Sequence, residues 1–136
     1  MVIDTSAVIA ILRREPDADA LLDAIAGAEA LAISAVSLLE ASMVLAGGRD
    51  TDGEWPPLDD FIASAEIEIV PFGPNQARLA RQAFARWGKG RHPAGLNLGD
   101  CCAYALAVER RAQLLFKGAD FVRTDIVPAL PPVVAH

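Results

Sequence analysis

The sequence has few residues of the kinds that carry disulfide or zinc chemistry, with two cysteines and two histidines in 136 residues. Cys101 and Cys102 are adjacent, so their side chains diverge on a helix, and a disulfide framework is excluded. His92 lies in a Gly/Pro-rich stretch and His136 is the last residue, neither at ligand spacing. We therefore expect buried, hydrophobic cysteines and no Cys/His zinc site.

Long hydrophobic runs are also missing. The chain is 53% hydrophobic with a positive mean hydropathy, but no uninterrupted apolar run approaches the roughly 20 residues that span a bilayer. The chain opens without the basic segment and apolar core of a signal peptide, and Asp4 would fit badly in such a core. Because roughly 100 to 200 residues make one domain, we expect a single cytoplasmic domain over residues 1–136, with no membrane association.

Strand patterns and helix patterns alternate along the chain. Five short runs predict strands, the last of them an edge strand: residues 2–4, 31–33, 67–70, 114–116 and 133–134. Helical patterns predict a helix that ends near residue 12, one over 16–28, one that ends near 44, and three over 58–65, 74–87 and 97–110. The stretches 49–57 and 88–95 are expected to be loops, the second more flexible. This alternation predicts an α/β fold with a mostly parallel sheet and helices on both faces.

Proline and glycine mark some of the expected helix ends. Pro16 suits a first helical position, where its missing N–H costs nothing. Gly47 and Gly48 suit the left-handed backbone that often ends a helix.

Four carboxylates fall where strands end or helices begin. Asp4 directly follows the first strand, and the carboxyl ends of strands are where open α/β sheets bind ligands. Glu40, Asp100 and Asp120 are expected at the same rim. Because buried charges beside apolar sequence need a partner or a metal, these acids predict a divalent-metal site.

Helix capping offers another explanation for two of these acids. Glu40 stands three residues after Ser37, the spacing of a capping box. Ser34 is a competing cap, however, and would place Glu40 inside the helix. Asp100 likewise follows Asn97 by three residues and could complement the helix dipole.

The other acids differ in how readily capping explains them. Asp120 could cap a short turn over residues 121–123, and Asp125 could be an ordinary surface acid. Asp4 is harder to explain, since Thr5 or Ser6 could cap the first helix alone and leave its carboxylate free.

Clustered carboxylates predict both a cation and a reaction. Like charges repel one another and raise carboxylate pKa values unless a cation compensates, and Mg²⁺ or Mn²⁺ prefers oxygen ligands. Two such ions about 4 Å apart can activate water and stabilise the leaving oxygen of a phosphodiester, without a catalytic His or Cys. The sequence leaves open whether one or two ions bind.

Four motifs carry a resemblance to a known family. In order, they are VIDTSA at 2–7, ISAVSLLEA at 33–41, GLNLGDC at 95–101 and LFKGADF at 115–121, followed by Thr124-Asp125. Together they resemble the PIN-domain ribonucleases and, within them, the VapC-type toxins of bacterial toxin–antitoxin pairs. The resemblance spans nearly the whole chain and implies a PIN fold and an endoribonuclease that hydrolyses RNA, whether tRNA, rRNA or mRNA.

The resemblance also implies roles for individual residues. Asp4, Glu40 and Asp100 correspond to metal ligands and catalytic acids, Asp120 to the fourth acid, and Thr5 or Ser6 to a nearby hydroxyl. Many relatives carry a polar or acidic residue where this chain has Ala119, so Asp125 competes with Asp120 for the fourth position.

Partners follow from the same resemblance. It implies a VapB-type antitoxin whose C-terminal segment lies across the acidic crevice, a homodimer, and operator DNA bound only through the antitoxin. Residues 38–45 carry more apolar surface than one small core consumes, which is typical of an interface.

Charge segregation bears on the RNA substrate. The net charge of −6 argues globally against nucleic-acid binding. Residues 69–99, however, contain no Asp or Glu, and their five basic residues predict phosphate contacts unless they only form a solvated helix face: Arg78, Arg81, Arg86, Lys89 and Arg91. Trp87 could stack on a base or belong to the core.

Three rival functions require residues or properties that can be compared with this sequence. A receiver-type phosphoacceptor domain needs an Asp at the end of its middle strand, but residues 67–72 end without one. A haloacid-dehalogenase-like phosphatase needs a second Asp where Ser6 stands. A non-catalytic PIN-fold module that acts through antitoxin binding remains the main alternative, although the intact acid set speaks against it.

Overall fold

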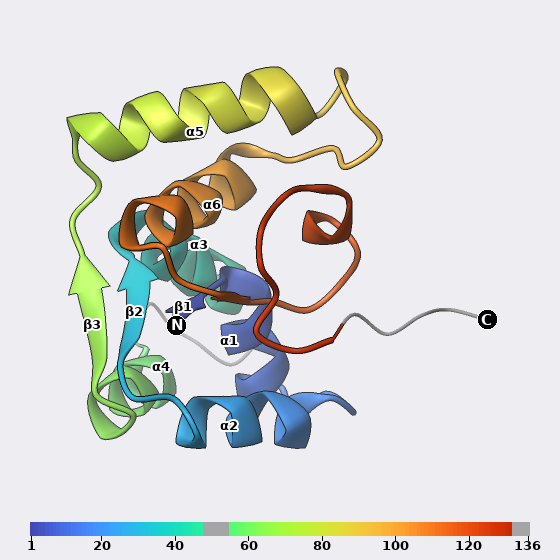
Figure 1. Cartoon of the computed structure of the whole chain (residues 1–136). Coiled ribbons are helices and arrows are strands. Elements are labelled where there is room, and N and C mark those ends of the chain that lie inside the picture. The colour runs from blue at the N-terminus through green and yellow to red at the C-terminus, as the bar shows by residue number, and fades with distance from the viewer. Residues whose placement is uncertain (48–54, 132–136) are drawn as a thin grey trace.

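The centre of the structure is a four-stranded parallel sheet (Figure 1). The computed structural model describes residues 1–47 and 55–131. The strands lie in the order β3-β2-β1-β4, and their bounds are Val2–Ile3 for β1, Leu31–Ser34 for β2, Ile67–Val70 for β3 and Leu114–Leu115 for β4. A parallel bridge between Leu114 and Pro128 continues the pairing beyond β4. The predicted α/β fold with a parallel sheet is confirmed.

Helices connect the strands and cover both faces of the sheet. Their bounds are Thr5–Leu12 (α1), Ala18–Ala26 (α2), Ala35–Ala46 (α3), Pro56–Ser64 (α4), Pro74–Trp87 (α5), Leu98–Arg110 (α6) and the 3₁₀ turn Phe121–Arg123 (η1). In Figure 1, α5 runs across the top of the molecule next to α6, and α2 lies at the opposite end. Among these described elements, no helix is long and apolar enough to cross a membrane.

Successive strand residues point into two separate cores. Val2, Ala32 and Leu114 pack with α5 and α6, whereas Ile3 and Ile33 pack with α1, α2 and α4. This is the two-residue period of a strand that is buried on both faces, and it explains why the segments of β1, β2 and β4 are apolar without alternation.

Several predicted element ends need correction. The second helix begins at Ala18, so Pro16 lies before it and not at its first position. The loop predicted over 49–57 ends earlier, because α4 begins at Pro56, where a proline at a helix start loses no hydrogen bond. Gly47 ends α3 with a φ of −71°, which is not left-handed. Gly48 and the edge strand predicted at residues 133–134 lie outside the described residues.

The connection between α5 and α6 is closed by its own backbone. Gly88 forms a parallel bridge with Leu96, and the Leu96 N–H donates to the Trp87 carbonyl at 2.9 Å. The Gly88 carbonyl also accepts from the N–H groups of Arg91 and His92. The loop expected to be flexible is therefore a hydrogen-bonded protrusion at the base of α6.

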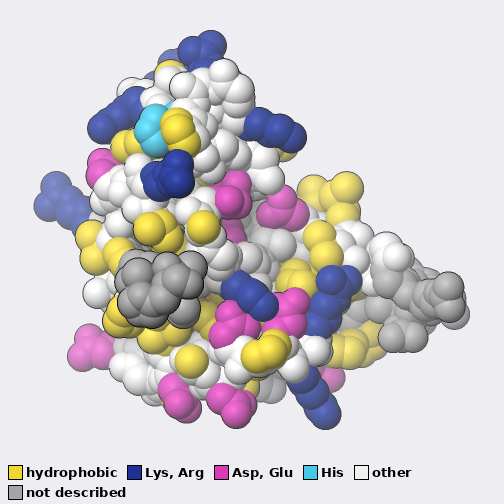
Figure 2. Space-filling model, turned by 90° about the vertical axis from the view of Figure 1, so that its right-hand side faces the viewer, with side chains coloured by type: hydrophobic (Ala, Val, Ile, Leu, Met, Phe, Trp, Pro, Cys, Tyr) yellow, Lys and Arg dark blue, Asp and Glu magenta, His cyan; other side chains and the backbone are white. Residues whose placement is uncertain are grey.

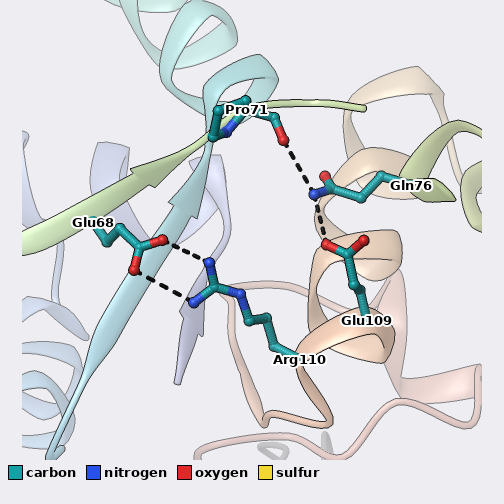
Figure 3. Close-up of polar contacts among 5 residues, drawn as sticks. All are labelled: Glu68, Pro71, Gln76, Glu109 and Arg110. Atoms are coloured by element: carbon teal, nitrogen blue, oxygen red, sulfur yellow. Dashed lines mark hydrogen bonds and ion pairs between the residues drawn. The ribbon is translucent and has the colours of Figure 1, made fainter. Parts of the chain in front are cut away.

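A polar network joins the far end of α6 to α5 and β3 (Figure 3). The Arg110 guanidinium contacts both carboxylate oxygens of Glu68, the shorter contact being 2.6 Å. The buried Gln76 donates from Nε2 to the Pro71 carbonyl at 3.1 Å and to Glu109 at 2.7 Å. Each of these carboxylates therefore has a donor.

Candidate metal centre

Asp4 is buried at the end of β1, where it caps α1. Its Oδ2 accepts from the Ser6 N–H at 3.0 Å and from the Ser6 hydroxyl at 2.6 Å. Thr5 does not cap this helix, because its hydroxyl donates to the Ser37 carbonyl at 3.0 Å. The expectation that Thr5 or Ser6 would cap the helix and leave Asp4 unengaged is thus wrong for Oδ2. It holds for Oδ1, which is buried and has no partner in the described residues.

Glu40 lies inside α3 and not in a capping box. Ser34 is the cap, since its hydroxyl accepts from the Val36 N–H at 3.2 Å. The carboxylate of Glu40 instead lies against Gly99 in the first turn of α6, so closely that a Cβ at Gly99 would collide with it. The absence of a side chain at Gly99 therefore allows Glu40 to reach the α6 N-terminus, beside Asp100.

Asp100 forms the capping box that the spacing to Asn97 indicates. The Asn97 N–H donates to Asp100 Oδ2 at 3.1 Å, and the Asp100 N–H donates to Asn97 Oδ1 at 2.9 Å. The carboxylate is buried at a helix N-terminus and in this respect resembles Asp4.

The structure separates the two candidates for the fourth acid. Asp120 is exposed at the start of η1 and makes no side-chain capping bond, and its charge acts on Asp100. Asp125 accepts a 2.7 Å hydrogen bond from the Tyr104 hydroxyl and lies 3.9 Å from Arg86 Nη1. Asp125 is therefore held in a different network, whereas Asp120 is the one of the two whose charge acts on Asp100.

Burial and mutual repulsion act together on these carboxylates. Burial raises the pKa of Asp4 from 3.8 to about 6, against the Ser6 hydrogen bonds, and the charge of Glu40 raises it further. Burial likewise raises the pKa of Asp100 to about 7, and the charges of Asp4, Asp120 and Glu40 add to that rise. Opposite charges would have lowered these pKa values, so the site has an excess of negative charge.

The nearest lysine does not supply the compensating charge. Lys117 Nζ lies 2.7 Å from Glu15 and 3.3 Å from Asp17, both outside the acidic site. Its backbone N–H donates to the Ser6 hydroxyl at 2.9 Å. Ser6 therefore connects Asp4 to the loop that carries Asp120, a contact over 111 residues of sequence that the sequence does not reveal.

The donor set fits a divalent cation. It offers only carboxylate oxygens, one of them the unpartnered Asp4 Oδ1, and Mg²⁺ and Mn²⁺ prefer such ligands. In the described residues, no three acidic, histidine or cysteine side chains already converge on one point at ligand distance.

The cysteines do not take part in this chemistry. Both are free and buried in α6, as predicted from the sequence. Burial raises the pKa of Cys101 to about 11, and the Asp100 charge adds to this. A thiol with this pKa is protonated at neutral pH and is not a nucleophile.

The basic residues predicted to bind RNA lie on α5 and the loop that follows it. All five are exposed: Arg78, Arg81, Arg86, Lys89 and Arg91. Arg86 lies 4.0 Å above the Trp87 ring and Arg91 lies 5.5 Å from the Phe84 ring centre. Figure 2 shows Lys and Arg side chains gathered at the top of one face, above acidic side chains around a hollow. Trp87 is buried against Tyr104 and belongs to the core.

Sequence reasoning missed two residues of this site. Gly99 creates the space for Glu40, and the signal for it was a glycine within a helical pattern next to Asp100. The link from Ser6 to Lys117 left no signal, because it depends on tertiary structure.

Comparison with known proteins identifies the family. A profile of the PIN domain matches residues 1–127. The chain belongs to the PIN-domain family. This PIN domain is 51% identical over 131 residues to ribonuclease VapC28 of Mycobacterium tuberculosis, which covers 96% of this chain and 98% of the relative. A VapC ribonuclease of Mycolicibacterium smegmatis is 45% identical over 132 residues, with 93% and 97% covered.

Solved structures share the fold of this PIN domain. The Mycobacterium tuberculosis toxin VapC20, which cleaves the sarcin–ricin loop, has a TM-score of 0.74 at 14% identity, covering 96% of this chain and 98% of that one. VapBC2 of Rickettsia felis, bound to a promoter DNA fragment, has a TM-score of 0.73 at 17% identity, with 93% and 94% covered. The predicted family and endoribonuclease class are confirmed, and the receiver and phosphatase alternatives are set aside.

Proposed function

We propose that this PIN domain is a metal-dependent endoribonuclease and the toxin of a type II toxin–antitoxin pair. The observation that carries the proposal is a group of carboxylates, two of them buried, that form no ion pair with Lys or Arg among the described residues and include the unpartnered Asp4 Oδ1, in a chain 51% identical to a ribonuclease. Carboxylates whose pKa values are raised by burial and by like charges cluster at catalytic sites.

The proposed ligands are Asp4, Glu40 and Asp100, with Asp120 as the fourth acid. Bound Mg²⁺ or Mn²⁺ would supply an activated water and charge compensation for phosphodiester hydrolysis. Asp4 Oδ1 is free to bind the ion because Ser6 occupies only Oδ2. The capping box orients Asp100, and Thr5 and Ser6 support the site by holding α3 and the Asp120 loop in place.

RNA is proposed to approach over α5 and the 88–95 loop. Arg78, Arg81 and Lys89 are exposed and have no acidic partner among the described residues, so they are available to phosphates. Arg86 and Arg91 rest on aromatic rings, which keeps them in place while their donors stay accessible.

An antitoxin is the proposed protein partner. Two of the fold neighbours are toxin–antitoxin complexes, and an acidic hollow suits a basic antitoxin segment that would block it. Operator DNA would then be bound through the antitoxin. A toxin that cleaves cellular RNA acts in the cytoplasm, so the proposed function agrees with the predicted location and with a single domain over the chain.

A second copy of the chain is proposed to cover the groove between α3 and α6. This groove, about 460 Å³, is lined by Val36, Leu39, Glu40, Met43, Val44, Asn97, Leu98 and Gly99. Leu98 is 79% exposed and Met43 65%. A protruding Leu98 beside an apolar groove is self-complementary, as a two-fold interface requires. Leu98→Glu should therefore give a monomer in light scattering.

The test is cleavage of a pooled RNA by purified, antitoxin-free protein with Mg²⁺ or Mn²⁺, beside EDTA and Asp100→Asn. Glu109→Gln is the matched control, because it removes a carboxylate charge from the same helix outside the site. Cleavage that requires metal and Asp100 but not Glu109 supports the proposal. Cleavage that Asp100→Asn leaves unchanged overturns it, and a folded protein that binds RNA or antitoxin but never cleaves points to the non-catalytic module.

A further inference from the structure

One side chain of the 88–95 loop, His92, is fixed by a bond to the loop itself. Its Nδ1 accepts a 3.0 Å hydrogen bond from the Ala94 N–H. The His92 N–H donates to the Gly88 carbonyl at 3.1 Å, and the Gly95 N–H donates to the His92 carbonyl at 3.0 Å. Backbone and ring are therefore both held, so His92 is oriented before any ligand arrives.

This arrangement determines which ring nitrogen is left over. Because Nδ1 is an acceptor, the proton of the neutral ring is on Nε2, on the side of the ring away from the Ala94 N–H. Within the described residues, Nε2 has no hydrogen-bond partner. The ring is half-buried, and the loop thus presents a donor that the protein itself does not use.

The surroundings of His92 indicate what that donor binds. Lys89 and Arg91 flank it in the sequence, and residues 69–99 contain no Asp or Glu that could accept from it. Figure 2 shows Lys and Arg side chains at the top of this face, above the acidic hollow. The same chain segment leads through Leu96 to the Asn97 cap and Asp100. A donor in a positive region that adjoins the site suits an anionic ligand on its way to that site.

We propose that His92 is a substrate-positioning residue whose Nε2–H donates to a backbone phosphate of RNA bound in the acidic hollow. The inference rests on the proposed ribonuclease function and adds a neutral donor to the five basic residues. A neutral donor releases no counterion, so its contribution persists at high salt, unlike that of Arg91.

The test compares two substitutions that separate the two ring nitrogens. His92→Asn keeps an acceptor near the Nδ1 position for the Ala94 N–H, as asparagine does in Asx turns, but its own amide donor lies near the Cδ2 position and does not reach as far as Nε2. His92→Phe keeps a ring but lacks both nitrogens. The measurement is binding of a short fluorescein-labelled mixed-sequence RNA with Mg²⁺ present, by proteins that also carry Asp100→Asn, which is expected to stop cleavage, with melting temperatures as a check on folding.

We expect both variants to bind about ten- to a hundredfold more weakly, the scale of one hydrogen bond to a charged group, with an unchanged salt dependence. Arg91→Ala should instead reduce the slope of log K against log salt by about 0.7. Normal binding by His92→Asn overturns the proposal, since the ring would then serve only the loop. Normal binding by His92→Phe beside weak binding by His92→Asn also overturns it, in favour of base stacking. Cleavage that persists while His92→Asn binds normally refutes this inference and leaves the ribonuclease proposal standing.

Discussion

The two ends of α6 hold carboxylates in opposite electrostatic states. At its C-terminal end, Glu68 is paired with Arg110, and this hydrogen bond and charge lower the pKa of Glu68 below 4.5 (Figure 3). At its N-terminal end, burial and like charges raise the pKa of Asp100 to about 7. A carboxylate thus contributes to stability at one end and opposes it at the other. A fold retains uncompensated buried charge where function requires it.

The largest effect is expected from removal of charge at the acidic end. Asp4→Asn should lower the rate of RNA cleavage at least about a hundredfold. Substitution of residues that only support metal ligands lowers activity about ten- to a hundredfold, and Asp4 is a proposed ligand itself. The fold should survive, because asparagine caps helices as well as aspartate does and its Oδ1 can accept from Ser6.

Glu68→Gln is the control, since it makes the same change of charge at the other end of the comparison. We expect its cleavage rate to stay within about twofold of wild type, as for most surface substitutions. Equal loss of cleavage in both variants would mean that the two ends do not differ in function. The measurement is initial cleavage rate at saturating Mg²⁺, with circular dichroism to verify folding.

A second prediction concerns the space that Gly99 leaves for Glu40. Gly99→Ala should displace the Glu40 carboxylate and lower the cleavage rate about ten- to a hundredfold, the cost of a small misplacement in a catalytic site. The free energy of unfolding should not fall, because alanine is more favourable than glycine in a helix by up to about 1 kcal/mol. The atoms nearest to the new Cβ belong to the flexible end of the Glu40 side chain, which can move away from it.

Gly73→Ala is the matched control, since a Cβ at that position has no atom within 4 Å. It should retain full cleavage, and its melting temperature should fall slightly, because Gly73 is the N-cap of α5 and alanine suits that position less well than glycine. If Gly99→Ala were as active as Gly73→Ala, the position of Glu40 against α6 would be irrelevant to catalysis.

The pH dependence of stability should differ in sign between the two ends. In metal-free protein, the pKa values of Asp4 and Asp100 are about 6 and about 7, above the ordinary 3.8. Between these limits the folded state binds more protons than the unfolded state, so stability falls as pH rises from about 4 to 7 and then levels off. Glu68, with its lowered pKa, contributes stability that is lost as pH falls.

Calorimetry in EDTA from acidic to mildly alkaline pH measures this. We expect Asp100→Asn to melt a few degrees higher than wild type near neutral pH and at the same temperature in acid. Added Mg²⁺ should raise the melting temperature of wild type near neutral pH and so abolish the difference between the two proteins. A wild-type melting temperature that rises over this range together with that of Asp100→Asn would contradict the raised pKa.

The smallest effect is expected at the far end of α6. Gln76→Leu removes two hydrogen bonds, to Pro71 and Glu109, and also the buried Gln76 Oε1, which has no partner in the described residues. Because these changes oppose each other, the free energy of unfolding should fall by about 1 kcal/mol. Urea unfolding measures it, and cleavage should be unchanged. A loss of cleavage in the folded variant would show that the two ends are coupled.

Local sequence pattern predicted most of the fold. The 67–70 strand and the 74–87 helix have the predicted bounds, because alternation and a starting proline are signals within the segment itself. The second helix was predicted two residues too long at each end. The exact ends of a helix depend on fraying and on which residue caps it. Both depend on contacts with other parts of the structure, which the sequence of the helix itself does not determine.

The candidate site was predictable as a set of residues but not as a set of contacts. Asp4 and Asp100 follow from their places after a strand and at a helix start. The choice between Asp120 and Asp125 did not follow from the sequence, since it depends on a hydrogen bond between Asp125 and Tyr104, 21 positions away. The Ser37 capping box was equally plausible by spacing, and the backbone of Ser34 decided against it.

By itself, then, the sequence determined the alternation of strands and helices, the parallel sheet, the family and the acids at the sheet rim, because each is encoded in short segments. Only the tertiary structure decided that Asp4 Oδ1 lacks a partner, that Glu40 fits over Gly99, that Lys117 is bound to Glu15 and Asp17, and that His92 presents Nε2. These features depend on the packing of side chains and on the direction of a ring or carboxylate, which spacing along the chain does not determine.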